Sequence, residues 1–220
     1  GKDNWKLDGR DLSKVTVPAY YPDNATIRGD LADYAIEVEW YDQHIGGALE
    51  QLEKRGMLEN TLIIATSDHG MPFPRVEGQI YDDGFHIPMA VRWGNRVPAG
   101  RVVTDFITFP DVAPTIMQAA GVKLHAQITG QSFLPQLLST KSGRIDPERN
   151  HTLLGKERHD IGRTDGDQLS VGYPARAIRN DNYLYVRNFK PDRWPGGDPA
   201  YGLSSARSSG FLKPSNAETG

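Results

Sequence analysis

The 220-residue sequence contains no cysteine, and this absence excludes disulfides, thiolate metal ligands and cysteine nucleophiles from the chain. The sequence also lacks a large excess of charge of either sign. It has 25 Lys and Arg and 28 Asp and Glu, so the formal net charge is -3. The chain therefore lacks the basic field that drives sequence-independent binding to nucleic acids. Its apolar runs, such as residues 62–65, are far shorter than the roughly 18 to 20 residues that span a bilayer.

What remains is the composition of an ordinary folded domain, with 38% hydrophobic and 24% charged residues. The length suits one large domain or a domain with a small appendage. An α/β pattern persists to about residue 140, after which Gly, Arg, Asp and Asn become frequent and the strands become short. We therefore expect an α/β domain over residues 1–140 and a smaller subdomain over residues 141–220.

The clearest local signal is a long helix followed by a buried strand. Apolar residues recur every three or four positions after Asp30, which is a suitable N-cap, and Gly56 supplies a left-handed stop. Gly46 and Gly47 lie inside this helix and predict close packing or a bend. Residues 60–66 then form a continuous branched apolar run, which favours a strand covered on both faces, as in a parallel sheet.

The remaining elements are too few for a complete α/β sandwich. The patterns predict strands at residues 87–92 and 102–107, a helix at residues 110–120, a short strand at residues 152–155, and a hairpin of residues 175–179 and 183–187. A sheet with helices on both faces needs more strands and helices than these. The chain is therefore interpreted as part of a domain.

The buried strand ends at Ser67-Asp68-His69-Gly70, and ligand sites in α/β sheets gather beyond the carboxyl ends of strands. The carboxylate of Asp68 suits any hard cation, whereas an imidazole such as His69 favours zinc over calcium or magnesium. The alternative is structural, with Asp68 capping a turn and His69 bonded to the backbone. Arg75 and Glu77 follow within nine residues as candidates for the same site, or as solvated loop charges.

A second group of ionisable side chains follows the short strand at residues 152–155. Lys156, Glu157, Arg158, His159 and Asp160 are consecutive, a density that suits the binding of a polar, anionic or hydroxyl-rich ligand. A solvated run of charges is the alternative reading. The sequence leaves both open.

Taken in order, several segments resemble the sulfatase family of the alkaline phosphatase superfamily, over most of residues 15–190. The segments are residues 30–34, 58–74, 84–88, 109–115, 130–134 and 175–179. Residues 71–74 and 156–159 look most like carbohydrate sulfatases related to heparan N-sulfatase. The resemblance implies the C-terminal part of an alkaline-phosphatase-like α/β sandwich, followed by a smaller subdomain with an antiparallel sheet.

The resemblance also implies an activity, namely hydrolysis of a sulfate ester or sulfamate on a glycosaminoglycan-like saccharide by formylglycine and one divalent cation. The cation is usually Ca²⁺, with Mg²⁺ or Zn²⁺ as alternatives. By this likeness Asp68 ligates the metal, and His69 contacts the metal, the sulfate or the nucleophile. Substrate binding falls to Arg75, Glu77, Lys156, Glu157 and His159. A periplasmic or secreted location follows from the family alone.

The sequence departs from the family in two respects. Formylglycine is made from the first residue of a Cys/Ser-x-Pro-x-Arg motif, and this chain has no such motif. We therefore expect the nucleophile on an N-terminal half of the enzyme that is outside this chain. Glu77 stands where related enzymes place a Lys or Arg that contacts the sulfate. Two other readings stay open, a zinc phosphodiesterase or phosphomutase of the same superfamily and a non-catalytic glycan-binding remnant.

Overall fold

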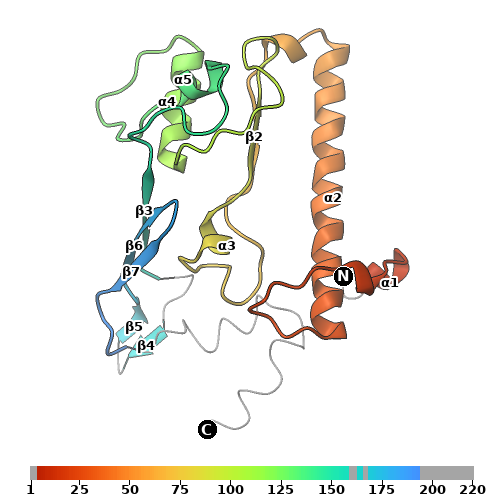
Figure 1. The fold of residues 1–220 in the computed structure, drawn as a ribbon, viewed down its shortest axis with the longest axis vertical. Coiled ribbons are helices and arrows are strands. Elements are labelled where there is room, and N and C mark those ends of the chain that lie inside the picture. The colour runs from red at the N-terminus through yellow and green to blue at the C-terminus, as the bar shows by residue number, and fades with distance from the viewer. Residues whose placement is uncertain (1–3, 159–162, 166–167, 194–220) are drawn as a thin grey trace.

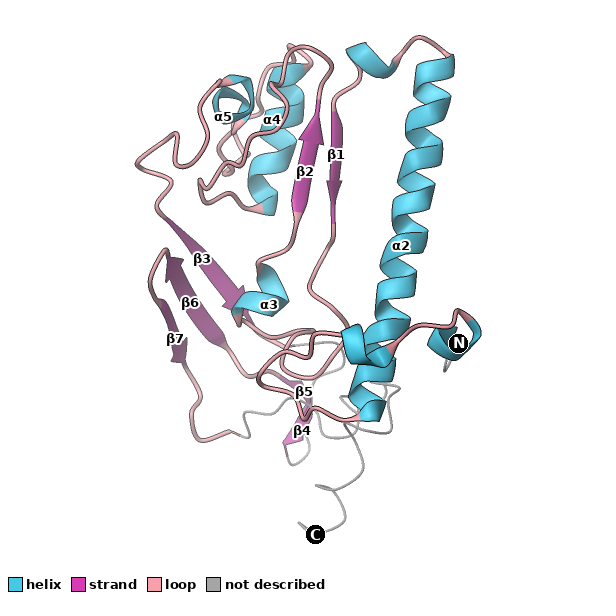
Figure 2. Ribbon diagram, turned by 45° about the vertical axis from the view of Figure 1, so that its right-hand side comes forward, coloured by secondary structure: helices cyan, strands magenta, loops and turns pink. Residues whose placement is uncertain are grey.

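The computed structural model describes residues 4–158, 163–165 and 168–193. A long helix, α2, runs alongside a two-stranded ribbon formed by β1 and β2 (Figure 1). Helices α4 and α5 lie on the other side of this ribbon, and a second small sheet of β3, β6 and β7 lies beyond one end of it (Figure 2). No helix within the described ranges combines the length and apolar character that a membrane span requires.

Helix α2 spans Ala25–Lys54 and begins earlier than the sequence predicts. Its N-cap is Asn24, whose side-chain oxygen accepts a hydrogen bond of 3.0 Å from the Ile27 N–H, so Asp30 lies inside the helix. The predicted stop is confirmed, since Gly56 adopts φ 66° just past the end. Of the predicted close packing or bend at Gly46, the described residues show no close packing, because a Cβ there would meet no atom within 4 Å.

The N-terminal lead-in is not plain extended chain. Two short helices, α1 (Asn4–Leu7) and η1 (Leu12–Lys14), pack on the first turns of α2. The Trp5 N–H donates to Asp33 over 2.7 Å, and Arg10 forms an ion pair with Glu39. A hydrophobic core lies beneath this lead-in and is formed by Tyr21, Ile27, Leu31, Phe73 and Val76.

The central ribbon corrects one expectation about the sheet. Strand β1 (Ile63–Thr66) pairs with β2 (Met89–Arg92) in antiparallel register, with Ile63 opposite Arg92, rather than in parallel. A short 3-10 helix, η2 (Leu58–Asn60), precedes β1, and the short helix α3 (Asp82–Phe85) precedes β2. Every residue of β1 is only half-buried, which differs from a strand covered on both faces.

The segment after β2 contains fewer strands than expected. Residues 102–107 form no strand, although Val103 makes an isolated bridge with Gly143 and the Phe106 N–H donates to the Arg149 carbonyl over 3.0 Å. The predicted helix is confirmed as η3 (Phe109–Asp111) followed by α4 (Val112–Ala119), and α5 spans Leu134–Leu138. A second hydrophobic core, which sits against β2, is formed by Trp93, Val97, Phe133, Leu134 and Leu137.

The C-terminal region contains the predicted hairpin. Strands β6 (Ala175–Asn180) and β7 (Leu184–Asn188) are antiparallel, and β3 (His151–Lys156) pairs with the other edge of β6. Strands β4 (Arg163–Asp165) and β5 (Gln168–Val171) form a separate antiparallel pair. The smaller subdomain therefore has the antiparallel sheet that was expected, while its boundary at residue 140 stays a prediction.

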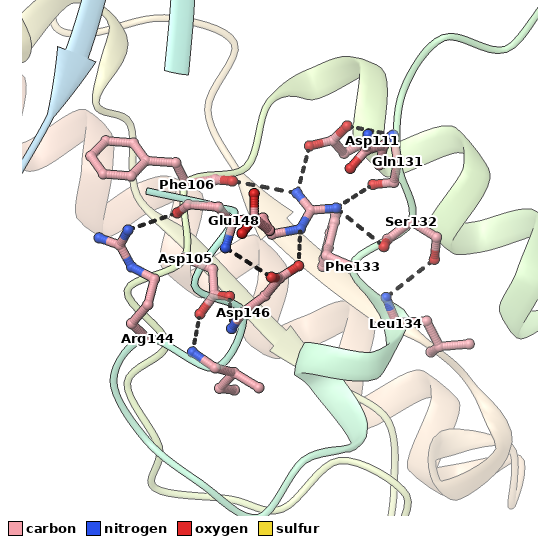
Figure 3. A network of polar contacts seen from close by, with 12 residues as sticks. Asp105, Phe106, Asp111, Gln131, Ser132, Phe133, Leu134, Arg144, Asp146 and Glu148 are labelled. Carbon is pink, nitrogen blue, oxygen red and sulfur yellow. Dashed lines mark hydrogen bonds and ion pairs between the residues drawn. The ribbon is translucent and has the colours of Figure 1, made fainter. Parts of the chain in front are cut away.

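A buried polar network joins the end of the α4–α5 region to the start of β3 (Figure 3). Arg149 is 8% exposed and donates to the Asp111 carboxylate over 3.1 Å. Its guanidinium also donates to the carbonyls of Gln131 and Ser132, at 2.8 and 3.2 Å. Since these donors and acceptors satisfy one another, we assign the network to structure rather than to ligand binding.

Candidate functional site

The candidate site is built at the carboxyl end of β1, where the chain leaves the ribbon. The Thr66 hydroxyl donates to the Pro88 carbonyl over 2.8 Å, and the Tyr41 hydroxyl of α2 donates to the Thr66 carbonyl over 3.2 Å. These contacts fix the last residue of β1 against both the start of β2 and the long helix. Asp68 follows two residues later, and its side chain is 86% exposed. The Asp68 carboxylate thus lies exposed just beyond a strand end that hydrogen bonds hold in place.

His69 lies beside Asp68 with a defined orientation. Its Nδ1 is 2.7 Å from the Gly70 carbonyl, and because a carbonyl only accepts hydrogen bonds, the proton sits on Nδ1 in the neutral ring. The Nε2 lone pair is then available, 3.6 Å from Asp68 Oδ2. The other oxygen, Asp68 Oδ1, accepts the His69 backbone N–H over 3.0 Å. Each residue therefore has one atom suited to a cation or a polar substrate.

Two glycines fix this strand tip against the loop that leads to β2. The Gly70 N–H donates to the Gly84 carbonyl over 3.2 Å. A Cβ at Gly70 would lie 1.9 Å from the Asp83 carbonyl oxygen, and one at Gly84 would lie 2.5 Å from the carbonyl oxygens of Gln79 and Val76. Only glycine permits backbones to approach this closely.

Arg75 lies on the same loop, exposed and between two aromatic rings. Its guanidinium carbon is 5.7 Å from the centre of the Tyr20 ring and 5.6 Å from that of Tyr81. The Tyr20 hydroxyl donates to the Asp83 carboxylate. Burial and this hydrogen bond raise the pKa of Tyr20 well above its usual range, so the phenol is neutral at physiological pH.

The predicted binding residues divide into those near this loop and those that turn away. Lys156, at the end of β3, donates to Gln79 Oε1 over 3.0 Å and so reaches the loop. Glu77 is half-buried on the loop itself, and its N–H donates to the Phe73 carbonyl over 3.2 Å. Glu157 instead forms an ion pair with Arg176 of β6. His159 falls outside the described residues.

The β3–β6–β7 sheet has a second attachment to the loop. Arg179 of β6 forms an ion pair with Asp82 of α3, with 2.9 Å between Nε and Oδ1. The hydrogen bonds that Arg179 donates to the Asp82 carboxylate raise the pKa of its guanidinium further. Together with the bond from Lys156 to Gln79, this pair places the subdomain sheet against the loop that carries Arg75 and Tyr81.

The described residues do not complete a metal site by themselves, since no three His, Asp or Glu side chains among them gather as a metal-binding group. Asp68 and His69 supply two ligand atoms, whereas calcium takes six to eight oxygens and zinc takes four ligands. The pair alone therefore does not fill the coordination sphere of either metal.

Sequence reasoning missed the residues that organise the site around Arg75. Tyr20 lies 55 positions before Arg75 in the sequence, and it belongs to the lead-in, where no local pattern points to a site. Tyr81 and Gln79 have ordinary loop neighbours. The glycines at positions 70 and 84 were a detectable signal, because glycine beside a polar strand end often marks a close backbone approach.

Comparison with known proteins shows what the chain is similar to. The family model "Sulfatase" matches residues 11–122. Over 181 residues the chain is 32% identical to an ulvan-active sulfatase of Formosa agariphila, covering 82% of this chain and 28% of that protein. It is 27% identical over 201 residues to human N-sulphoglucosamine sulphohydrolase, covering 84% of this chain and 36% of the relative.

The fold is shared with a solved protein in complex with its substrate, D-glucosamine-2-N,6-O-disulfate. The TM-score is 0.56 at 22% identity, covering 78% of this chain and 37% of that one. The chain thus spans about a third of the length of these relatives and has part of an alkaline-phosphatase-like α/β fold. Since the family model matches half of its residues, the chain belongs to the sulfatase family.

Proposed function

We propose that this chain supplies one side of the active site of an enzyme that hydrolyses sulfate esters or sulfamates on a glycosaminoglycan-like carbohydrate. The observation that carries the proposal is the exposed pair of Asp68 and His69 on a fixed strand tip, in a chain of the sulfatase family. The similarity to an ulvan-active sulfatase and to N-sulphoglucosamine sulphohydrolase supports the substrate class.

In this proposal Asp68 ligates one divalent cation, which we take to be Ca²⁺, with Mg²⁺ or Zn²⁺ as alternatives. Such a cation stabilises negative charge that develops on the sulfate oxygens. The Nδ1–H of His69 is already engaged by the Gly70 carbonyl, so its Nε2 is the atom that accepts a proton or contacts the metal or the sulfate. Lys156 and Arg75 supply positive charge toward the anionic substrate.

The attacking group, a formylglycine, belongs to the N-terminal half of the enzyme, outside this chain. Two features of the described residues support such a partner. Strand β1 pairs only with β2 in the described part of the chain, which leaves its other edge open for a further strand. Val38, Trp40 and Tyr41 of α2 are 46, 60 and 50% exposed, and a covering layer would bury them.

Sulfate release from sulfated disaccharides tests the proposal, using the complete enzyme and its Asp68→Ala variant. We expect Asp68→Ala to lose activity by at least about a hundredfold, because the cation loses a charged ligand. Asp42→Ala is the matched control, since Asp42 is an exposed carboxylate on α2. Turnover by Asp68→Ala at the rate of the control would refute the role of Asp68. The 220-residue chain alone should give no turnover.

A zinc phosphodiesterase is the second candidate, because the Nε2 of His69 is a nitrogen ligand, which favours zinc over calcium. Elemental analysis of the complete enzyme distinguishes the two. One calcium per active site supports the sulfatase proposal, and two zinc ions support the phosphodiesterase. Binding of sulfated glycans without any turnover of sulfate or phosphate esters would instead indicate a non-catalytic remnant.

A further inference from the structure

Arg75 has an unusual backbone conformation. Its φ of 69° lies in the left-handed region, and it is the only residue other than glycine with a positive φ in the described part of the chain. Residues other than glycine rarely adopt this backbone conformation, and those that do often belong to functional sites. Gly would fit this turn without strain. The conformation of the turn therefore does not explain why an arginine occupies this position.

The guanidinium of Arg75 is oriented but not neutralised. It lies over the rings of Tyr20 and Tyr81, at 5.7 and 5.6 Å from their centres, which restricts its freedom. No carboxylate pairs with it among the residues that the structure describes. A guanidinium presents a planar fork of N–H donors, which matches the two oxygens of a carboxylate or sulfate.

The two rings also offer apolar surface for a sugar. Tyr20 is 36% exposed and Tyr81 is 48% exposed, so neither ring is buried in a hydrophobic core. Aromatic side chains that keep one edge in contact with water are well suited to binding amphipathic ligands. An exposed cation beside two exposed rings is therefore suited to a saccharide that carries a negative charge.

Contacts place this cluster next to the strand tip but not on it. Tyr20 binds the Asp83 carboxylate, and the Asp83 carbonyl packs directly on Gly70. Asp83 thus contacts both Tyr20 of the Arg75 cluster and Gly70, the residue after His69. A ligand whose sulfate sits at the strand tip would present a neighbouring group to Arg75.

We propose that Arg75, Tyr20 and Tyr81 form a subsite that recognises a second anionic group on the substrate, separate from the sulfate that is cleaved. The inference rests on the proposed sulfatase function and specifies its substrate as a saccharide with two anionic groups. The second group is a carboxylate of a uronic acid or a further sulfate, because both present paired oxygens to the fork.

The test measures kcat/KM of the complete enzyme and its Arg75→Gly variant for three sulfated disaccharides. One carries a uronic carboxylate, one carries the same sugar with the carboxyl reduced to an alcohol, and one carries a second sulfate in its place. Selectivity is the ratio of kcat/KM for an anionic substrate to that for the reduced one. Glycine keeps the left-handed turn, so the variant removes the guanidinium and retains the loop conformation.

We expect Arg75→Gly to lower selectivity by about tenfold or more, through KM, and Arg75→Lys to recover part of it. Comparison of the disaccharide that carries the carboxylate with the one that carries the second sulfate shows which anionic group the subsite recognises. Arg96→Ala is the control, since Arg96 is exposed and stacks 4.6 Å over Trp93 beyond the opposite end of the ribbon, and it should keep the wild-type selectivity.

Two results would overturn the inference. One is unchanged selectivity in Arg75→Gly for both anionic substrates. The other is an equal fall in kcat/KM for all three disaccharides, which would assign Arg75 to the sulfate that reacts. Failure of the proposed function is distinct, because the wild-type enzyme would then release no sulfate from any of the three.

Discussion

Replacing Gly70 with alanine tests whether close backbone packing holds the strand tip in place. The added Cβ would lie 1.9 Å from the Asp83 carbonyl oxygen and 2.7 Å from Val76 Cγ1. Ordinary contact begins at 3.4 Å, so the Asp83 carbonyl must retreat by about 1.5 Å. That oxygen belongs to the backbone, and no change of side-chain rotamer relieves the clash.

The cost follows from two contributions. Overpacking in a tight site costs about 1 to 3 kcal/mol, and weakening the hydrogen bond from Gly70 to Gly84 costs about 0.5 to 1.5 kcal/mol. We expect Gly70→Ala to lower the free energy of unfolding by about 2 to 4 kcal/mol. Activity should fall further, because displacement of catalytic groups by roughly 1 Å costs about a hundredfold.

The same substitution elsewhere supplies the control. Gly46 lies inside α2, and a Cβ there meets nothing within 4 Å. Gly46→Ala should raise the free energy of unfolding by up to about 1 kcal/mol, since glycine disfavours a helix interior. Urea denaturation followed by tryptophan fluorescence measures both variants. Equal stability of Gly70→Ala and wild type, or equal losses in the two variants, would refute the packing argument.

Two further predictions concern stability. Arg149→Ala should lower the free energy of unfolding by about 3 to 5 kcal/mol, because it leaves the buried Asp111 carboxylate without its cation, and a loss below about 1 kcal/mol in urea denaturation would contradict this. Burial raises the pKa of Tyr21 from 10.0 to about 12, so the folded state keeps a proton that the unfolded chain releases, and stability should be full below pH 10 and fall as pH rises to 12. Tyr21→Phe should weaken that alkaline dependence in unfolding curves between pH 8 and 12, and an identical dependence would count against the assignment.

Much of the local structure follows from the sequence because it depends on near neighbours. The helical repeat predicted α2, and the apolar run at residues 60–66 contains β1. The hairpin of β6 and β7 was predicted from two short strands around a turn. The predicted start of α2 was wrong by several residues because the side-chain oxygen of Asn24, rather than that of Asp30, accepts the capping hydrogen bond.

The direction of strand pairing was predicted wrongly for a physical reason. An apolar run indicates a covered strand, but the direction of its neighbour depends on which segment lies beside it. Here that neighbour is β2, which returns along β1 after the loop of residues 67–88. The partial exposure of β1 also depends on its surroundings, so it could not be predicted from the residues of the apolar run.

By itself the sequence determined the family resemblance, the absence of the nucleophile motif, and the position of Asp68 and His69 just after a strand. These properties belong to residue identity and short spacing. Only the tertiary structure decided that Tyr20 meets Arg75, that Gly70 touches Asp83, and that Lys156 reaches Gln79 while Glu157 turns to Arg176. Those contacts join segments up to 77 residues apart, and their partners are selected by packing and backbone geometry rather than by any local pattern.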